Sequence, residues 1–314
     1  MTDALLQVRG LAKRYGPITI VENISFDLHR GEVLGIVGES GSGKTTIARA
    51  LLRLIEPSAG SVQFAGQNLA TLPARALRPL RARLQYVFQD PYSSLSPRMT
   101  VGEILTEGLR IQGIGPQAAR LARARQALAD VELPDDAINR YAHEFSGGQR
   151  QRIGIARALA LQPEVLVADE PVSALDVSIQ AQVINLLRGL QQRLGLAMLF
   201  ISHDLAVVEY LCDRVMVLYL GRIMELAPSD RLYSQPAHPY TRALLAAVPQ
   251  PDPARRGHRH LLAGDIPSAA APPSGCVFRT RCPNAQPECA ANVPSLREIA
   301  PGHWKACLRD DLPA

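Results

Sequence analysis

The 314 residues suffice for one large packed domain and a smaller second one, and 47% hydrophobic against 20% charged residues excludes wholesale disorder. The net charge is +5, and arginine supplies almost all of the positive charges. The basic run RRGHRH (255–260) has no aromatic neighbour, which favours a solvated linker over a nucleic-acid surface. The N-terminus lacks a signal-peptide pattern, and no apolar run approaches the roughly 18 residues of a membrane span, so we expect a soluble, cytosolic chain.

The start of the chain is predicted to be rich in strands, because apolar residues alternate or run unbroken there between glycines. The expected strands cover residues 5–15, 21–29, 32–38 and 61–66. The third of them, EVLGIVG, has the unbroken apolar character of a strand buried on both faces. A helix (45–55) follows it after a glycine-rich loop, and this order is typical of a parallel α/β core.

Further along the chain, helices and strands alternate. Residues 71–135 are predicted to be largely helical, with a strand and a turn-rich loop at 85–99. The next expected elements are a helix at 148–161, a strand at 164–169, a helix at 178–194 and a strand at 197–202. This alternation predicts a parallel sheet. The chain becomes proline-rich and loop-like after residue 250, so we place a domain boundary between a main domain (1–250) and a C-terminal extension (251–314).

The loop GESGSGKT (38–45) matches the phosphate-binding pattern G-x-x-x-x-G-K-[ST] in full, between a predicted strand and a predicted helix. The glycines let successive backbone N–H groups face one anion, and the start of the helix adds its positive dipole end. Lys44 can place its charge on the β- and γ-phosphates, and the Thr45 hydroxyl can ligate Mg²⁺. The loop therefore predicts a bound polyphosphate group and Mg²⁺ as ligands.

VLVADE (165–170) supplies a buried strand that ends in two carboxylates. Asp169 can hold Mg²⁺ through water, and Glu170 is placed to polarise an attacking water. The alternative for both is a helix-capping role. Gln89 follows another predicted strand and can touch the metal or the water. His203 also ends a predicted strand, where it can contact a γ-phosphate or simply be solvated.

FSGGQRQRIGIARAL (145–159) resembles the signature of ABC transporter ATPases, and with the motifs above the chain resembles their ATP-binding subunit over residues 5–235. The resemblance implies a P-loop NTPase of the α/β class. Its RecA-like parallel-sheet core carries an antiparallel β subdomain and an α-helical subdomain at about 90–160. It also implies ATP hydrolysis between two such domains, each completing the other's site.

The resemblance implies a role for each matching residue. The residues implied to contact ATP are Tyr15, stacked on adenine, and Gly38, Ser40, Gly41, Ser42, Gly43, Lys44, Thr45 and Thr46. The signature residues, which bind the γ-phosphate held by the other subunit, are Ser146, Gly147, Gly148 and Gln149. The D-loop is Ser173, Ala174, Leu175 and Asp176. The implied catalytic residues are Glu170, His203 and Gln89, and Thr45, Gln89 and Asp169 are the implied Mg²⁺ ligands.

Four longer stretches resemble ATPases of oligopeptide and dipeptide importers, in particular the F-type subunit of their pair. They are residues 139–187, QDPYSSLSPRMTVGEI (89–104), HPYTRALLAAVP (238–249) and GCVFRTRCP (275–283). This resemblance implies a second, related ATPase as partner, two transmembrane permease subunits, an extracytoplasmic solute-binding protein and no nucleic acid. It places the chain at the cytoplasmic face of the inner membrane, with the surface around 89–104 receiving a helix from each permease.

Four of the five cysteines lie near the C-terminus with the spacing C-x5-C-x6-C-x17-C, at Cys276, Cys282, Cys289 and Cys307. A cytosolic chain is not expected to hold structural disulfides, so the cluster is a candidate metal site. Wide gaps suit a larger object than zinc. Related importers imply a 4Fe-4S cluster, and zinc, free thiols and disulfides remain open alternatives. The remaining thiol, Cys212, is expected in the core.

The cargo stays open, because the ATPase does not touch it; relatives move dipeptides, oligopeptides, nickel chelates, glutathione and murein peptides. A soluble ABC ATPase acting in translation or DNA repair is a second class, but such proteins usually carry two ATPase units or long coiled-coil insertions, absent from this sequence. A regulatory protein with an inactive site is a third class, against which the intact motif residues argue.

Overall fold

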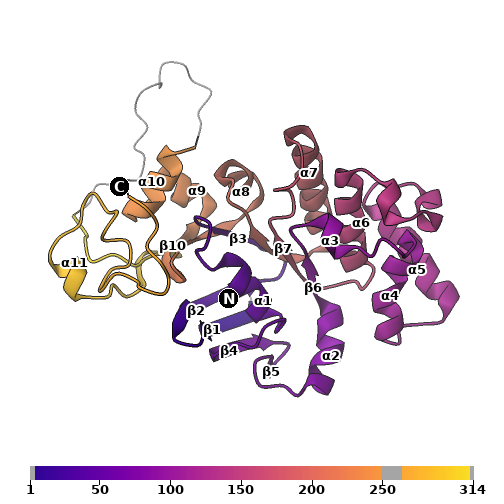
Figure 1. Cartoon of the computed structure of the whole chain (residues 1–314), viewed down its shortest axis with the longest axis horizontal. Coiled ribbons are helices and arrows are strands. Elements are labelled where there is room, and N and C mark those ends of the chain that lie inside the picture. The colour runs from indigo at the N-terminus through magenta and orange to yellow at the C-terminus, as the bar shows by residue number, and fades with distance from the viewer. Residues whose placement is uncertain (1–3, 249–263, 312–314) are drawn as a thin grey trace. The chain divides into compact units, whose positions relative to one another are not determined.

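The computed structural model describes residues 4–248 and 264–311 (Figure 1). The chain forms two compact units, each assembled from segments distant in sequence. The first unit contains residues 27–32 and 63–201, and the second contains 7–26, 33–62 and the chain from residue 202 onward. The domain boundary predicted after residue 250 and the predicted linker RRGHRH lie outside the described residues.

The first unit contains three parallel strands in the order β6-β7-β8. They are β6 (Leu84–Val87), β7 (Val165–Asp169) and β8 (Ala197–Ile201). Every residue of β7 and β8 is buried, as their unbroken apolar sequences predict. Because parallel strands end at the same edge, Asp169 pairs with Ile201 there, and residues just beyond the strands gather at that edge.

Helices make up most of the rest of the first unit. They are α2 (Ala74–Arg83), α3 (Pro91–Ser94), α4 (Val101–Ile111), α5 (Gln117–Asp130), α6 (Gly147–Leu159) and α7 (Val177–Leu194), with two 3-10 helices, η1 (Asp135–Asn139) and η2 (Ala142–Glu144). The helices α3 to α6 lie together and pack on one another (Figure 1). The apolar faces of α4 and α5 are buried between them, so the predicted helical region is present.

The second unit contains five adjacent sheet strands in the order β11-β12-β10-β9-β3. Strand β3 (Val33–Val37) runs parallel to β9 (Arg214–Tyr219). The sheet continues beyond β9 with antiparallel pairs, through β10 (Arg222–Pro228), β12 (His303–Lys305) and β11 (Arg297–Ala300). Strands β9 to β12 are additional to the predicted ones. Through β12, the C-terminal extension contributes strands to the same sheet as the phosphate-loop strand β3.

Strands β1 (Ala4–Tyr15), β2 (Ile18–His29), β4 (Ala59–Phe64) and β5 (Gln67–Asn68) form a second sheet in the order β2-β1-β4-β5. The two-residue connection after Tyr15 makes β1 and β2 a hairpin. The Gly10 amide donates to the Ser25 hydroxyl at 2.8 Å. A Cβ at Gly60 would lie 2.4 Å from the Gly10 carbonyl oxygen, so only glycine permits this approach of β4 to β1.

The helices of the second unit are shorter. They are α1 (Lys44–Leu51), α8 (Leu205–Leu211), α9 (Ser229–Ser234), α10 (Pro239–Ala246) and α11 (Glu288–Ala291). Cys212 follows α8 and is 5% exposed, which confirms the prediction of a core thiol. Burial raises the pKa of this thiol, so it is inert. A Cβ on Gly35 would lie 2.9 Å from its sulfur, so β3 packs tightly against the end of α8.

Candidate ATP-binding and catalytic site

The predicted ATP-site residues divide between the two units. The second unit carries Tyr15, the loop 38–46 and His203, and the first carries Gln89, the signature 146–149, the pair 169–170 and the D-loop 173–176.

The phosphate loop of the second unit has a backbone that demands glycine. Gly38 has φ 152°, and a Cβ there would lie 2.2 Å from the Leu218 carbonyl oxygen of β9. Gly43, with φ 98°, is the residue before α1, and Gly41 also has positive φ. The loop is thus a fixed turn that packs on β9 and leads directly into the first turn of α1, where backbone N–H groups lack helical partners.

Lys44 is only 6% exposed, yet it is the first residue of α1. Its Nζ donates to the carbonyl oxygens of Gly38 at 2.7 Å and Glu39 at 3.1 Å, so it lies across the loop. The Ser42 hydroxyl is buried and has no hydrogen-bond partner among the described residues. A buried charge and an unpaired hydroxyl in one turn suit an anionic group. Thr45 and Thr46 follow in the first turn of α1 and are partly buried.

Tyr15 lies at the end of β1 and is 51% exposed. Lys13 holds its Nζ 4.6 Å from the centre of the Tyr15 ring. This cation–π contact orients a ring that remains accessible for stacking.

The two carboxylates after β7 have different surroundings. Asp169 is 1% exposed and accepts a hydrogen bond from the Tyr86 hydroxyl of the neighbouring strand β6. Glu170 is partly exposed, and its backbone N–H donates to the Ile201 carbonyl oxygen at 3.0 Å, which fixes it to the end of β8. Its φ of 45° is rare for a residue with a side chain, a feature that clusters at functional sites.

Gln89 and Glu170 meet although 81 positions separate them. Gln89 lies two residues beyond β6, and its Nε2 donates to Glu170 Oε2 at 2.9 Å. The parallel neighbours β6 and β7 bring these two side chains to the same sheet edge. This places an amide and a carboxylate, both exposed enough to meet a ligand, beside the buried Asp169. Two predicted catalytic residues are therefore in contact.

The D-loop follows directly from Glu170. The Ser173 hydroxyl donates to the Glu170 carbonyl oxygen at 3.1 Å, so the loop turns back on the backbone of Glu170. Asp176 is the residue before α7. Leu175 lies between them, and a Cβ on Gly147 would be 3.5 Å from its side chain. The start of the signature helix and the D-loop are therefore neighbours.

The signature begins α6 with a reciprocal cap. Gln149 N–H donates to the Ser146 hydroxyl at 3.4 Å, and Ser146 N–H donates to the Gln149 side-chain oxygen at 3.0 Å. A Cβ on Gly148 would lie 2.4 Å from the Ile179 side chain of α7. Gly148 therefore lets the start of α6 pack closely on α7, while Ser146 and Gln149 remain exposed.

His203 follows β8 and is exposed. Its neighbours hold its backbone in place. The Ser202 hydroxyl accepts from the Asp204 N–H at 3.0 Å, and the Asp204 carboxylate caps α8 by accepting from the Ala206 N–H at 2.9 Å. This arrangement presents the imidazole at a strand end, as the sequence predicts.

Three further residues support the site without any signal in the sequence. Tyr86 holds Asp169, the Tyr240 hydroxyl accepts from the Glu39 N–H at 3.0 Å, and Arg281 forms an ion pair with Glu39. Glu39 lies 201 positions from Tyr240 and 242 from Arg281. Only an alignment of related sequences or a structure reveals such distant pairs.

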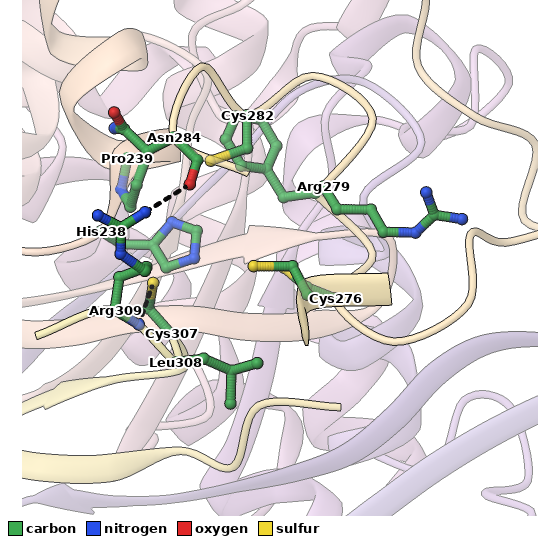
Figure 2. Close-up of a pocket in the computed structure, with 11 residues that line it drawn as sticks. His238, Pro239, Cys276, Arg279, Cys282, Asn284, Cys307, Leu308 and Arg309 are labelled. Carbon is green, nitrogen blue, oxygen red and sulfur yellow. Dashed lines mark hydrogen bonds between the residues drawn. The ribbon is translucent and has the colours of Figure 1, made fainter. Parts of the chain in front are cut away.

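The four C-terminal cysteines line one pocket in the second unit, together with His238 and Phe278. Figure 2 shows the sulfur atoms of Cys276, Cys282 and Cys307 directed toward its interior. The Cys276 N–H donates to the Cys289 carbonyl oxygen at 2.8 Å, which joins two loops of the extension.

These cysteines are free thiols. Among the described residues, no group of three or more His, Cys, Asp or Glu side chains forms a site that fits a metal ion. Burial raises the pKa of Cys276 and raises that of Cys282 to about 11, so without a bound cation these thiols stay protonated at neutral pH. A thiolate-binding group would therefore have to displace their protons.

Comparison with known families agrees with this geometry. Residues 21–173 match the ABC transporter family, and residues 224–289 match the C-terminal region of oligopeptide/dipeptide transporters. A Brucella ovis protein, provisionally named as a peptide import ATP-binding protein, is 70% identical over 317 residues, which cover 99% of this chain and all of that protein. This chain belongs to the family of ABC transporter ATP-binding proteins. A Bacillus subtilis member, the oligopeptide transport ATP-binding protein AppF, is 50% identical over 94% of this chain and 91% of its own.

Solved members of the family share the fold of this ABC ATPase. The cbiO1 subunit of Clostridium perfringens, part of an ABC transporter complex, aligns with a TM-score of 0.67 and 27% identity over 74% of this chain and 92% of its own. The cassette MJ0796, solved as a dimer bound to ADP and phosphate, aligns with a TM-score of 0.65 and 28% identity over 71% and 98%. The α/β P-loop fold expected from the sequence is thus confirmed. Among the described residues, no helix is both long and apolar enough to span a membrane.

Proposed function

We propose that this ABC ATPase energises the import of dipeptides or oligopeptides by a membrane transporter. The contact between Gln89 and Glu170 at 2.9 Å, beside the buried Asp169, is the observation that carries the catalytic part of the proposal. The peptide part rests on the match of residues 224–289 and on the names of the relatives. Nickel chelates, glutathione and murein peptides are the alternative cargoes.

The phosphate loop binds the triphosphate in this proposal. Lys44 leaves the carbonyls of Gly38 and Glu39, which it contacts at 2.7 and 3.1 Å, and turns its ammonium toward the β- and γ-phosphates. The Ser42 hydroxyl, buried without a described partner, gains an oxygen acceptor. Tyr15 stacks on the adenine. The remaining loop residues of the proposed ATP set act mainly through backbone N–H groups: Gly38, Ser40, Gly41, Gly43, Thr45 and Thr46.

Thr45, Asp169 and Gln89 would hold Mg²⁺, which would offset charge on the phosphates. Oxygen donors are the ligands that this ion prefers, so the residues fit it. Glu170 orients the attacking water, and the Gln89 amide fixes the Glu170 carboxylate for that task through its 2.9 Å hydrogen bond. His203 donates to the γ-phosphate. Positioning and charge compensation, the main requirements of phosphoryl transfer, are thereby met.

Turnover of ATP by the purified chain, alone and with a partner ATPase, tests the catalytic role of Glu170. Glu170→Gln keeps the shape of the side chain and its contact with Gln89 but removes the charge that polarises water, so kcat should fall by about 10²-fold or more with ATP binding retained. Glu132→Gln is a matched control, because that carboxylate is 68% exposed and pairs with Arg152 on the surface. Equal turnover of the parent and Glu170→Gln would show that this role is wrong.

The signature suggests a paired ATPase. Ser146, Gly147, Gly148 and Gln149 form a helix start that lacks a lysine and exposes Ser146 and Gln149, and we propose that it binds the γ-phosphate held by a second ATPase. The D-loop (Ser173, Ala174, Leu175 and Asp176) lies beside it and would face the same partner. A related but distinct ATPase is the proposed partner, and mixed-chain pull-down with ATP and Glu170→Gln tests whether the pair forms.

A groove between α4 and α5 supports contact with membrane subunits. Met99, Thr100, Glu103 and Thr106 are among its lining residues, and it overlaps the predicted docking surface at 89–104. We propose that it receives a short cytoplasmic helix of a permease, which would place the chain at the inner face of the cytoplasmic membrane. The extracytoplasmic solute-binding protein then acts on the other side.

Filling this groove tests the permease contact. Thr106→Trp should leave ATP turnover of the isolated chain unchanged but block co-purification with the permeases. Gln126→Trp on the exposed side of α5 is the control. Retained co-purification of the Thr106→Trp chain would contradict the proposal.

The thiol pocket supports a proposal of a resident 4Fe-4S cluster, with zinc as the alternative. Cys276, Cys282, Cys289 and Cys307 are its proposed ligands, because all four line one pocket and thiolates suit either group. The spacing C-x5-C-x6-C is wider than the C-x2-4-C pairs usual for structural zinc, and this spacing is the argument for the cluster over a single zinc ion. When bound, the group would cross-link the loops of the extension.

Metal analysis of protein purified without oxygen distinguishes the alternatives. Iron and acid-labile sulfide in equal amounts, lost in Cys282→Ser, would support the cluster. Zinc without sulfide would support the structural-ion alternative, and no metal would leave free thiols. Cys212→Ser is the control, since that thiol is buried away from the pocket.

A further inference from the structure

The C-terminal extension reaches the phosphate loop through one side chain. Arg281 Nη1 lies 2.6 Å from Glu39 Oε2, and Arg281 Nη2 lies 3.0 Å from Glu39 Oε1. This two-point pairing is the geometry in which a guanidinium binds a carboxylate most strongly. Glu39 is the second residue of the phosphate loop, and Arg281 directly precedes Cys282 of the thiol pocket.

The Arg281 side chain is buried and held in place by its neighbours. The residue is 8% exposed, and its guanidinium lies 5.8 Å from the centre of the Tyr219 ring at the end of β9. The hydrogen bonds with Glu39 raise the pKa of Arg281, so the side chain is charged at every relevant pH. The Phe278 ring contacts the rings of Tyr219 and Tyr240 at 5.3 and 5.1 Å and anchors the segment that carries Arg281.

Glu39 is held on its other sides by groups of the loop and of α10. Its backbone N–H donates to the Tyr240 hydroxyl at 3.0 Å. Its carbonyl oxygen accepts from the Ser42 N–H and from Lys44 Nζ, both at 3.1 Å. The Glu39 carboxylate is the one acidic side chain within the loop 38–45, where the remaining groups favour an anion.

A carboxylate in a phosphate-binding loop opposes the binding of a triphosphate unless its charge is balanced. The Glu39 side chain is only 24% exposed, so water screens it incompletely. The Arg281 guanidinium supplies a matched positive charge at hydrogen-bond distance and also turns the carboxylate toward the extension.

We propose that Arg281 is a positioning residue of the ATP site, which neutralises Glu39 and holds its carboxylate away from the bound triphosphate. The extension thereby sets the affinity of the phosphate loop for ATP. This inference rests on the proposed ATPase function. It assigns Arg281 no contact with the nucleotide, because the residue acts through Glu39.

Equilibrium binding of Mg²⁺–ATP to the full chain, purified without oxygen, tests the proposal. Arg281→Met keeps most of the side-chain volume but leaves Glu39 charged, and we expect Kd to rise about tenfold, which corresponds to about 1.4 kcal/mol. Adding Glu39→Gln to Arg281→Met removes the unbalanced charge and should bring Kd back to within about threefold of the parent value. Arg281→Lys, which keeps the charge without the two-point pairing, should lie between the parent and Arg281→Met.

Arg279→Met is the matched control. Arg279 lies two positions away on the same loop, and its Nε donates within the extension to the Ser274 carbonyl oxygen at 2.9 Å. It should bind ATP as the parent does. In turnover assays Arg281→Met should raise KM and leave kcat nearly unchanged, whereas a general loss of folded protein would lower kcat and leave KM alone.

The outcomes separate this inference from the proposed function. Failure of the parent chain itself to bind ATP would overturn both. A parent that binds ATP, with Arg281→Met binding equally well, would overturn the role of Arg281 alone. The same conclusion follows if the double variant binds as weakly as Arg281→Met. Should Arg281→Met not fold, the comparison of Arg281→Lys with Arg281→Lys/Glu39→Gln decides by the same criterion.

Discussion

Gly148 in the signature offers a sharp test of how the first unit is packed. It lies in the first turn of α6, and a Cβ added there would be 2.4 Å from Ile179 Cγ2 in the first turn of α7. A normal contact between two carbon atoms is about 3.5–4.0 Å, so Gly148→Ala requires a shift of more than an ångström at this point. Ile179 is β-branched and changes its side-chain conformation only at a cost.

The expected penalty is that of overpacking. Such insertions typically cost about 1–3 kcal/mol, and we expect the upper half of that range because the atom in the way is attached directly to Cβ of Ile179. The alanine also offers a small compensation, since it favours a helix over glycine by about 1 kcal/mol. The net destabilisation should therefore be about 1–2 kcal/mol. Urea unfolding of the full chain, followed by circular dichroism, measures it.

Removal of the obstructing atom should reverse the effect. Ile179→Ala eliminates Cγ2, so Gly148→Ala added to Ile179→Ala should cost nothing or should stabilise through helix propensity. ATP turnover should follow the same pattern if α6 and α7 must keep their spacing. An equal penalty for Gly148→Ala in both backgrounds would refute the packing argument, and strain in the backbone would then be the cause.

Three further changes test other parts of the molecule. Gly38→Ala should abolish ATP binding and destabilise the second unit by a few kcal/mol, because the new Cβ would lie 2.2 Å from the Leu218 carbonyl oxygen; unchanged ATP affinity in a binding titration would contradict this. Tyr86→Phe should cost about 1–3 kcal/mol in urea unfolding, because the buried Asp169 carboxylate loses a donor, and an unchanged midpoint would speak against that bond. The hydrogen bond from Arg83 on α2 lowers the pKa of Glu164 below the ordinary 4.5. The stabilisation that ionised Glu164 provides is therefore present above pH 4.5 and is lost as the pH falls through the pKa of the folded state. The stability of Glu164→Gln should accordingly approach that of the parent as pH falls below 4.5, and a constant difference would exclude this linkage.

The strands and loops that carry the nucleotide motifs were predictable because their chemistry is local. The phosphate loop, β7 and the start of the signature helix each lie within one short stretch, where glycine spacing and apolar runs suffice. The sheet edge that joins Gln89 to Glu170 was expected in general terms from the alternation of strands and helices. Register between strands distant in sequence is not encoded locally, so the partners Tyr86 and Arg281 were beyond such reasoning.

The extension illustrates the same limit. Its proline-rich composition suggested an appendage, yet β12 pairs with β10. The buried Glu225 of β10 accepts from the Ala237 and His238 N–H groups at 2.8 and 2.9 Å, and it lies 2.7 Å from His303 Nε2 in β12.

Burial alone would raise the pKa of Glu225, but these hydrogen bonds outweigh it and lower the pKa. Loss of β12 would leave a fully buried carboxylate short of a partner, a costly state. The described extension (264–311) and the phosphate-loop strand β3 belong to one compact unit and one sheet. Arg281, which directly precedes Cys282 of the thiol pocket, connects that pocket to Glu39 of the phosphate loop.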